Sequence, residues 1–408
     1  MDDHGAKPAV GGNDEGIGTR GADLGPWDKL QLGWLDYEVA LANQRRTLNL
    51  GPHEYNSAKP QAVVVVLPKK AVTTELGAPF AGEKQWWSQQ GDDLDNWMSR
   101  DVTLPAGTAA SLSFQARWNI EDCGPDPCDY AYVEVSTDGS TWTAIPGSIT
   151  NPDEGNGIDG VQEAWTNATF DLSAYAGQTV GLRIRYVTDG AAQGTDPDLP
   201  AGIFVDDIAI TAGGTTILTD GAESSPNGWT LHGFVSIGTS QTINYDNYYI
   251  ASHRTYVSYD RYLRTGPYNF GFPDKPNWAE HFPYDHGLLI WYWDTSYSDN
   301  DVANHPGHGE ILPIDAHPRP IYNLTGAPWR DRIALYDAPF SLHKAPSFTL
   351  HINGQPSYIR GQAAQPVFDD SRQYWYPETP TTGVQVPNTG TRIRVLSEDG
   401  TSMRIRIS

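Results

Sequence analysis

Carboxylates near the ends of predicted strands are the side chains whose types and spacing first suggest chemistry. They fall in a glycine-bounded turn, at a strand end and the start of the next strand, and in the acidic pair of a Phe-Val-Asp-Asp-Ile run. Grouped carboxylates are costly unless something neutralises them. Hard cations take oxygen ligands, so we expect calcium, although solvated loop carboxylates are the alternative. The candidate ligands are Asp92, Asp93, Asp95, Glu121, Asp129, Asp206 and Asp207.

The charge distribution supports the same region. The 408-residue chain has 27 basic and 50 acidic residues, a formal charge of −23. Residues 83–223 alone contain 23 acidic and 5 basic side chains. Such a surface repels nucleic-acid phosphates and anionic lipid, which argues against a nucleic-acid partner.

Two cysteines, Cys123 and Cys128, are separated by Gly-Pro-Asp-Pro. Two sulfurs cannot complete a structural zinc site, and no histidine lies between His53 and His232 to add ligands. A short-loop disulfide worth roughly 2 kcal/mol is the better interpretation, and it implies an oxidising, extracellular compartment. Residues 1–4, Met-Asp-Asp-His, do not resemble a signal peptide, so we expect the export signal to lie outside this chain.

A second set of ligand types follows in a loop. His305-Pro-Gly-His308 is followed by Asp315 and His317, and we treat these four residues as a candidate functional loop. Pro and Gly forbid a helix there, but loops also bind metals. A turn with exposed imidazoles is the alternative. The sequence contains neither the HExxH helix of zinc peptidases nor the GxSxG turn of serine hydrolases.

The elements that must position these residues are mainly strands. Apolar and polar residues alternate around 112–118, 131–135 and 180–184, which predicts half-buried strands. Residues 61–67 predict a fully buried strand, and strands are also expected over 348–352, 391–396 and 403–407. Residues 26–35 predict a short helix with Trp27 and Trp34 on one face. No apolar run is long enough to span a membrane.

Several of these segments, in this order, resemble the immune inhibitor A family of secreted bacterial zinc metallopeptidases. The matching segments are residues 24–35, 85–96, 118–121, 129–136, 170–175, 204–208, 287–294 and 305–318. The resemblance implies a MAM-like jelly-roll sandwich, a second β-sandwich-like domain and a short helical remnant of the catalytic domain. It also implies that the family's zinc motif would precede residue 24, where this chain has no HExxH.

The resemblance suggests an inserted domain. We expect residues 1–57 to end the catalytic domain and residues 83–229 to form the jelly-roll. Residues 58–82 and 230–408 would then form the second β-domain around it. The acidic segment at 83–223 marks nearly the same boundaries by charge alone.

The sequence is compatible with three functions. The chain is either the accessory part of a secreted zinc endopeptidase that acts on proteins, a calcium-dependent glycan- or protein-binding module, or a secreted scaffold without catalysis. In the second case exposed tryptophans would serve as platforms, although core packing is the ordinary role of tryptophan. The candidate platforms are Trp86, Trp87, Trp97, Trp142 and Trp165.

Overall fold

A computed structural model of the chain describes residues 22–408 apart from 125, 267 and 276–279. The protein is mainly β with little helix, as the sequence predicts. It divides into two compact units: Met1–Val72 with Asn244–Ser408, here called the discontinuous unit, and Thr73–Ile243, the central unit. The chain passes between them in β4 (Lys70–Glu75) and β16 (Ser240–Tyr245), which pair with each other. The first 21 residues of the expected segment 1–57 lie outside the described residues.

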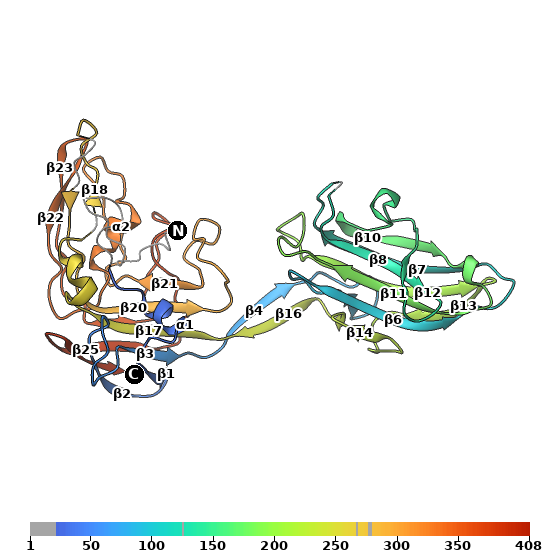
Figure 1. Ribbon diagram of the computed structural model, residues 1–408, viewed down its shortest axis with the longest axis horizontal. Coiled ribbons are helices and arrows are strands. Elements are labelled where there is room, and N and C mark those ends of the chain that lie inside the picture. Colours follow the sequence, from blue (N-terminus) through green and yellow to red (C-terminus); the bar gives the residue numbers. More distant parts are fainter. Residues whose placement is uncertain (1–21, 125, 267, 276–279) are drawn as a thin grey trace. The chain divides into compact units, whose positions relative to one another are not determined.

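The central unit consists of two antiparallel sheets (Figure 1). The first has the order β10 (Gly160–Asp171), β7 (Ala110–Ile120), β12 (Gly202–Ala212), β5 (Gln85–Trp87) and β15 (Val235–Ile237), with β13 (Thr215–Asp220) also beside β12. The second has the order β14 (Thr230–His232), β6 (Asp95–Thr103), β11 (Thr179–Val187), β8 (Tyr130–Ser136) and β9 (Thr143–Ala144). Two 3₁₀ turns, η1 (Pro152–Glu154) and η2 (Ser173–Tyr175), lie in the loops before and after β10.

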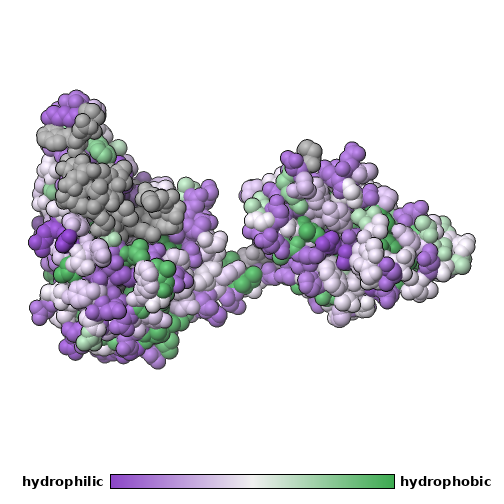
Figure 2. Space-filling model, in the orientation of Figure 1, coloured by the Kyte–Doolittle hydropathy of each residue, from purple (hydrophilic) through white to green (hydrophobic). Residues whose placement is uncertain are grey.

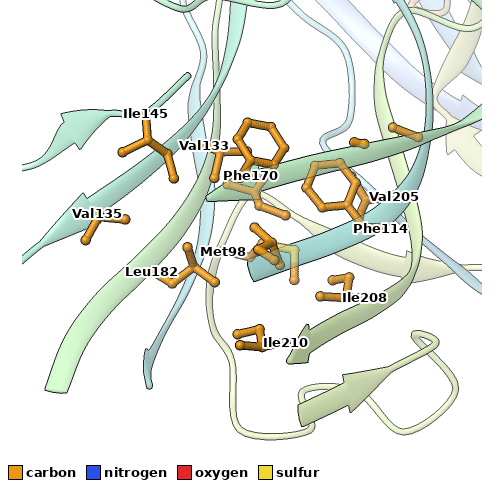
Figure 3. Close-up of a cluster of buried hydrophobic side chains, with 14 of the residues drawn as sticks. Met98, Phe114, Val133, Val135, Ile145, Phe170, Leu182, Val205, Ile208 and Ile210 are labelled. Atoms are coloured by element: carbon orange, nitrogen blue, oxygen red, sulfur yellow. The ribbon is translucent and has the colours of Figure 1, made fainter. Parts of the chain in front are cut away.

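One hydrophobic core fills the space between these two sheets. Phe114 of β7 stacks on Phe170 of β10, while Val133 and Leu182 enter from the other sheet (Figure 3). Each is at most 1% exposed. The predicted alternation is confirmed over 112–116 and 180–184, where buried residues occupy every second position. In β8 the predicted inward residues lie in the core, but Glu134 and Ser136 on its other face are buried as well, so this strand is not half-exposed.

The discontinuous unit also has two principal sheets (Figure 1). One has the order β1 (Tyr37–Leu41), β3 (Ala62–Val66), β17 (Asn247–Arg254), β20 (Gly287–Asp294) and β21 (Ile311–Ile314), with β1 parallel to β3. The other has the order β2 (Arg46–Leu50), β26 (Ser402–Ile407), β25 (Arg392–Asp399) and β24 (Val367–Asp369). The smaller elements are α1 (Pro26–Gln31), α2 (Asp331–Ala334), η3 (Ser258–Arg264), η4 (Leu335–Asp337), β18 (Tyr268–Asn269), β19 (Glu280–His281), β22 (Phe348–Ile352) and β23 (Gln355–Ile359).

The large sheet of this unit is buried on both faces at β3, although its edge strand β1 is largely exposed. Val63 and Val65 of β3 pack in the core shared with the second sheet, whereas Ala62 and Val64 face a core that includes Trp27 of α1. A strand buried on both faces needs a continuous apolar run, and Ala-Val-Val-Val-Val supplies it.

Helix α1 is shorter than predicted. It ends at Gln31, and Gly33 adopts a left-handed φ of +70°. Trp34 is 62% exposed, so the expected helical face from Trp27 to Trp34 is wrong over its last turn. The carbonyl of Lys29 accepts the N–H groups of Trp34 and Leu35, which closes the chain back on the helix end.

The face seen in Figure 2 is mostly hydrophilic, with smaller hydrophobic areas, as expected for an exposed protein surface. Among the described residues no helix is long and apolar enough to cross a membrane.

Candidate metal centres

Three strand ends of the central unit bring Glu121, Asp129 and Asp189 together, here called the carboxylate cluster. Glu121 follows β7, Asp129 precedes β8 and Asp189 follows β11. One carboxylate oxygen from each lies within 4.8 Å of the others. Antiparallel pairing of Val187 with Tyr130 places the end of β11 beside the start of β8, which explains why Asp189 meets Asp129.

Asp129 is the buried member of the carboxylate cluster. Its side chain is 0% exposed, and Oδ1 accepts the N–H of Asp189 at 2.9 Å. Its Oδ2 is buried and has no hydrogen-bond partner. Burial raises the pKa of Asp129 to about 6, and the negative charges of Asp189, Glu121 and Asp92 add to the rise. Clustered carboxylate oxygens around an unsatisfied buried one suit a hard cation such as calcium.

The three carboxylates of the predicted turn, Asp92, Asp93 and Asp95, differ in how they relate to the carboxylate cluster. Asp92 is close enough for its charge to raise the pKa of Asp129. The N–H of Asp93 donates to the carbonyl of Asp189 at 2.6 Å. Asp95 instead accepts two hydrogen bonds from Arg185, at 2.7 and 2.9 Å, which lower its pKa. Both carboxylate oxygens of Asp95 are therefore engaged in an ion pair with Arg185.

Asp206 and Asp207 lie within β12, away from the strand ends of the carboxylate cluster. Asp206 is opposite Gln115, and the register shifts between Asp206 and Ala209. Burial raises the pKa of Asp206, while its oxygens accept N–H groups from Ala81 at 3.0 Å and Asp207 at 2.7 Å. Backbone donors thus satisfy Asp206 without a cation.

The disulfide between Cys123 and Cys128 is formed, as predicted. Its loop joins β7 to β8 and so connects Glu121 to Asp129. Asp189 is the cluster residue that sequence reasoning missed. The signal that could have found it is the Asp-Gly pair at 189–190, directly after an alternating strand.

The four candidate residues of the loop from His305 to His317 form two separate groups. His305 Nδ1 lies 2.7 Å from the carbonyl of His308, and its Nε2 lies 2.7 Å from Asp299 Oδ1. The ring of His308 stacks on Tyr297. These contacts form a closed turn, and neither histidine belongs to the group formed by Asp315 and His317.

Asp315, His317 and Asp337 form a buried electrostatic group. His317 Nδ1 lies 3.0 Å from the carbonyl of Asp337, and its Nε2 lies 2.8 Å from the carbonyl of Ala363. Carbonyl oxygens only accept hydrogen bonds, so these two contacts leave His317 surrounded by acceptors. Burial raises the pKa values of Asp315, to about 6, and of Asp337. The charge of His317 partly offsets the rise at Asp315, and both of its ring nitrogens face backbone carbonyls.

Side-chain burial tests the tryptophans that were considered as ligand-binding platforms. Trp86 and Trp87 are 0% and 2% exposed, so they are core residues and their assignment as platforms is wrong. Trp142 packs under Arg183 at 4.3 Å, and Trp97 stacks on His232.

These features define a two-unit β-protein with a disulfide and metal-type side-chain clusters. Two family models match it: the MAM domain of immune inhibitor A-like proteins over residues 44–239, and the VEG domain of immune inhibitor A-like metallopeptidases over residues 242–407. The chain therefore belongs to the immune inhibitor A-like family.

Two relatives agree with this assignment. The pre-pro-metalloprotease PrtV of Vibrio cholerae serotype O1 is 32% identical over 399 residues, which cover 93% of this chain and 40% of PrtV. Immune inhibitor A of Bacillus thuringiensis subsp. alesti is 30% identical over 362 residues, which cover 86% of this chain and 48% of that protein. The chain thus spans less than half the length of these relatives.

Proposed function

We propose that this chain provides calcium-stabilised accessory β-domains of a secreted zinc metalloendopeptidase and hydrolyses no peptides by itself. The family membership and the name of PrtV support the peptidase context. The sequence has no HExxH motif, and zinc hydrolysis requires a metal-bound water and a general base. The catalytic zinc and the protein substrate are therefore assigned to the parent enzyme. The disulfide supports an extracellular location.

The proposed domain layout is an insertion. The central unit would be a jelly-roll corresponding to residues 83–229, placed within a second β-domain made of 58–82 and 230–408. The two compact units support this layout. Helix α1 would be a remnant at the end of the catalytic domain, whose proposed range is 1–57.

The observation that carries the calcium proposal is the unpartnered Oδ2 of buried Asp129. A buried carboxylate next to two others pays a large electrostatic penalty in the absence of a cation. Calcium bound at the carboxylate cluster would offset most of the charge of the three carboxylates and supply the missing partner of Oδ2. The ion would also hold in place the loops that follow β7 and β11. Because these loops would then be ordered, they would resist proteolysis.

Calorimetric titration with calcium tests this proposal. We expect one site per chain, and a melting temperature of the central unit about 5–10 °C higher at saturating calcium. Asp129→Asn should lower the calcium affinity at least about tenfold, because it removes the charged ligand. Asp101→Asn is the matched control, since Asp101 is an exposed carboxylate of β6 in the same unit.

Two results would contradict the proposal. Equal calcium binding by the wild type and Asp129→Asn would place the ion elsewhere. Casein hydrolysis by the purified chain, abolished by a zinc chelator, would show that it is an active peptidase.

A further inference from the structure

A second cluster of metal-type ligands lies in the discontinuous unit. Asp285 and His286 directly precede β20, and His343 lies in the loop between η4 and β22. Asp285 Oδ1 is 3.0 Å from His343 Nε2 and 3.3 Å from His286 Nδ1. All three ligand atoms lie within 4.8 Å of one another. We call this group the His–Asp cluster.

We propose that the His–Asp cluster binds a divalent transition metal ion, with zinc as the best match. Two imidazoles and one carboxylate form a ligand set that zinc uses. Ligands about 2.0–2.1 Å from a tetrahedral zinc lie roughly 3.3 Å from each other, close to the separations within this cluster. The fourth position would be left to water or to a further side chain.

The orientation of the two rings is already restricted. His286 and His343 stack with centroids 4.2 Å apart and an angle of 19° between planes. This places His286 Nδ1 and His343 Nε2 at the edge that faces Asp285. The other nitrogen of His343, Nδ1, lies 3.2 Å from Glu398 Oε2 of β25. A carboxylate behind a metal-binding histidine fixes its tautomer and raises its basicity.

A buried and unpartnered imidazole is an independent observation at the same end of the sheet. His253 is 2% exposed, and its Nδ1 is buried without a hydrogen-bond partner. It pairs across β17 and β20 with Leu288, two residues after His286. The charges of Glu398 and His286 both act on His253, which places it within the electrostatic range of the cluster.

An ion-pair network without a metal ion accounts for fewer of these contacts than a bound metal ion does. In such a network a protonated His343 would donate to both Asp285 and Glu398. These two carboxylates raise the pKa of His343 to about 10. In this network His286 Nδ1 lies 3.3 Å from Asp285 Oδ1 without good hydrogen-bond geometry, and His253 Nδ1 is buried without a hydrogen-bond partner. A cation beside Asp285 would give His286 Nδ1 a ligand role. The side chains of His286 and His343 are 39% and 30% exposed, so an ion can enter from solvent.

The test is zinc binding by the whole chain, measured by titration and elemental mass spectrometry with excess calcium present. We expect one zinc per chain. His286→Ala should abolish this binding and keep the melting temperature measured in chelator, because the side chain is partly exposed. Glu398→Gln should weaken zinc affinity about 10–100-fold, as loss of a supporting carboxylate does. The matched control is His305→Ala with His308→Ala, which should bind zinc normally.

Cobalt provides a second readout that does not depend on variants. Co²⁺ bound by nitrogen and oxygen ligands should show visible absorption bands, and zinc should displace them with the same stoichiometry. The proposal is overturned if the wild-type chain binds no zinc saturably, if His286→Ala binds it equally well, or if only the His305/His308 variant loses it.

Discussion

Asp129 is one of the groups that should make the stability of the central unit depend on pH. Its folded-state pKa is raised to about 6 by burial, so the native state holds its proton more tightly than the unfolded chain does. Without calcium, its contribution to stability is therefore present at low pH and is lost as pH rises from about 4 to 6. The loss is at most about 3 kcal/mol, from a shift of roughly two pH units.

Comparison with Asp129→Asn isolates this effect from other titrating groups. In chelator at neutral pH, we expect the variant to have a higher free energy of unfolding than the wild type. The difference should disappear near pH 4, because the wild-type carboxyl is then protonated. Saturating calcium should reverse the order, since only the wild type gains the ion. Urea unfolding at several pH values measures all three conditions, and a pH-independent difference would contradict the argument.

At the residue scale, the sequence could indicate part of each site. Glu121 and Asp129 were predicted because acids beside predicted strands are visible locally. Asp189 was missed because its place depends on the pairing of β8 with β11, which no local pattern specifies. The same reason applies to His286 and His343, which are 57 positions apart in the sequence. Long-range strand pairing decided which candidates meet.

At the scale of elements, alternation was the most reliable signal. Strands β7 and β11 follow it, because each buries one face against a single core, whereas β8 also buries Glu134 on its other face. Strand β3 was recognised from its apolar run, although the parallel partner β1 was not predicted. The helix prediction failed after Gln31, where Gly33 favours a left-handed conformation over another helical turn.

The disulfide between β7 and β8 should contribute to calcium binding as well as to overall stability. Removing the Cys123–Cys128 bond opens a very short loop, so the chain-entropy model gives a cost of roughly 2 kcal/mol. The freed loop must then order Glu121 and Asp129 when calcium binds. We expect Cys123→Ser with Cys128→Ser to weaken calcium binding about three- to thirtyfold.

Calcium titration of this double variant measures the effect, and zinc binding by the same sample is its internal control. The zinc affinity should stay constant, because the His–Asp cluster belongs to the other compact unit. Unchanged calcium affinity would show that the loop is ordered without its disulfide.

At the scale of the whole molecule, the two crossings between units lie side by side. The hydroxyls of Thr73 and Thr242 are 2.8 Å apart, and the N–H of Leu76 donates to the carbonyl of Thr239 at 2.7 Å. Strands β4 and β16 could therefore be joined by a tight turn. An inserted domain whose two ends are adjacent in space can be removed without stretching the remaining chain.

We therefore expect a chain in which residues 76–239 are replaced by Asn-Gly to fold. Asn-Gly favours the two-residue hairpin turn that would connect β4 to β16. The product should unfold cooperatively and bind zinc like the full chain, because the two sheets and the His–Asp cluster of the discontinuous unit are retained. A deletion of residues 64–250 is the control. It removes much of β3 and half of β17, which pair at the centre of the large sheet, and should not fold. If the shorter deletion also fails to unfold cooperatively, the discontinuous unit depends on the central unit for stability, and the insertion layout is contradicted.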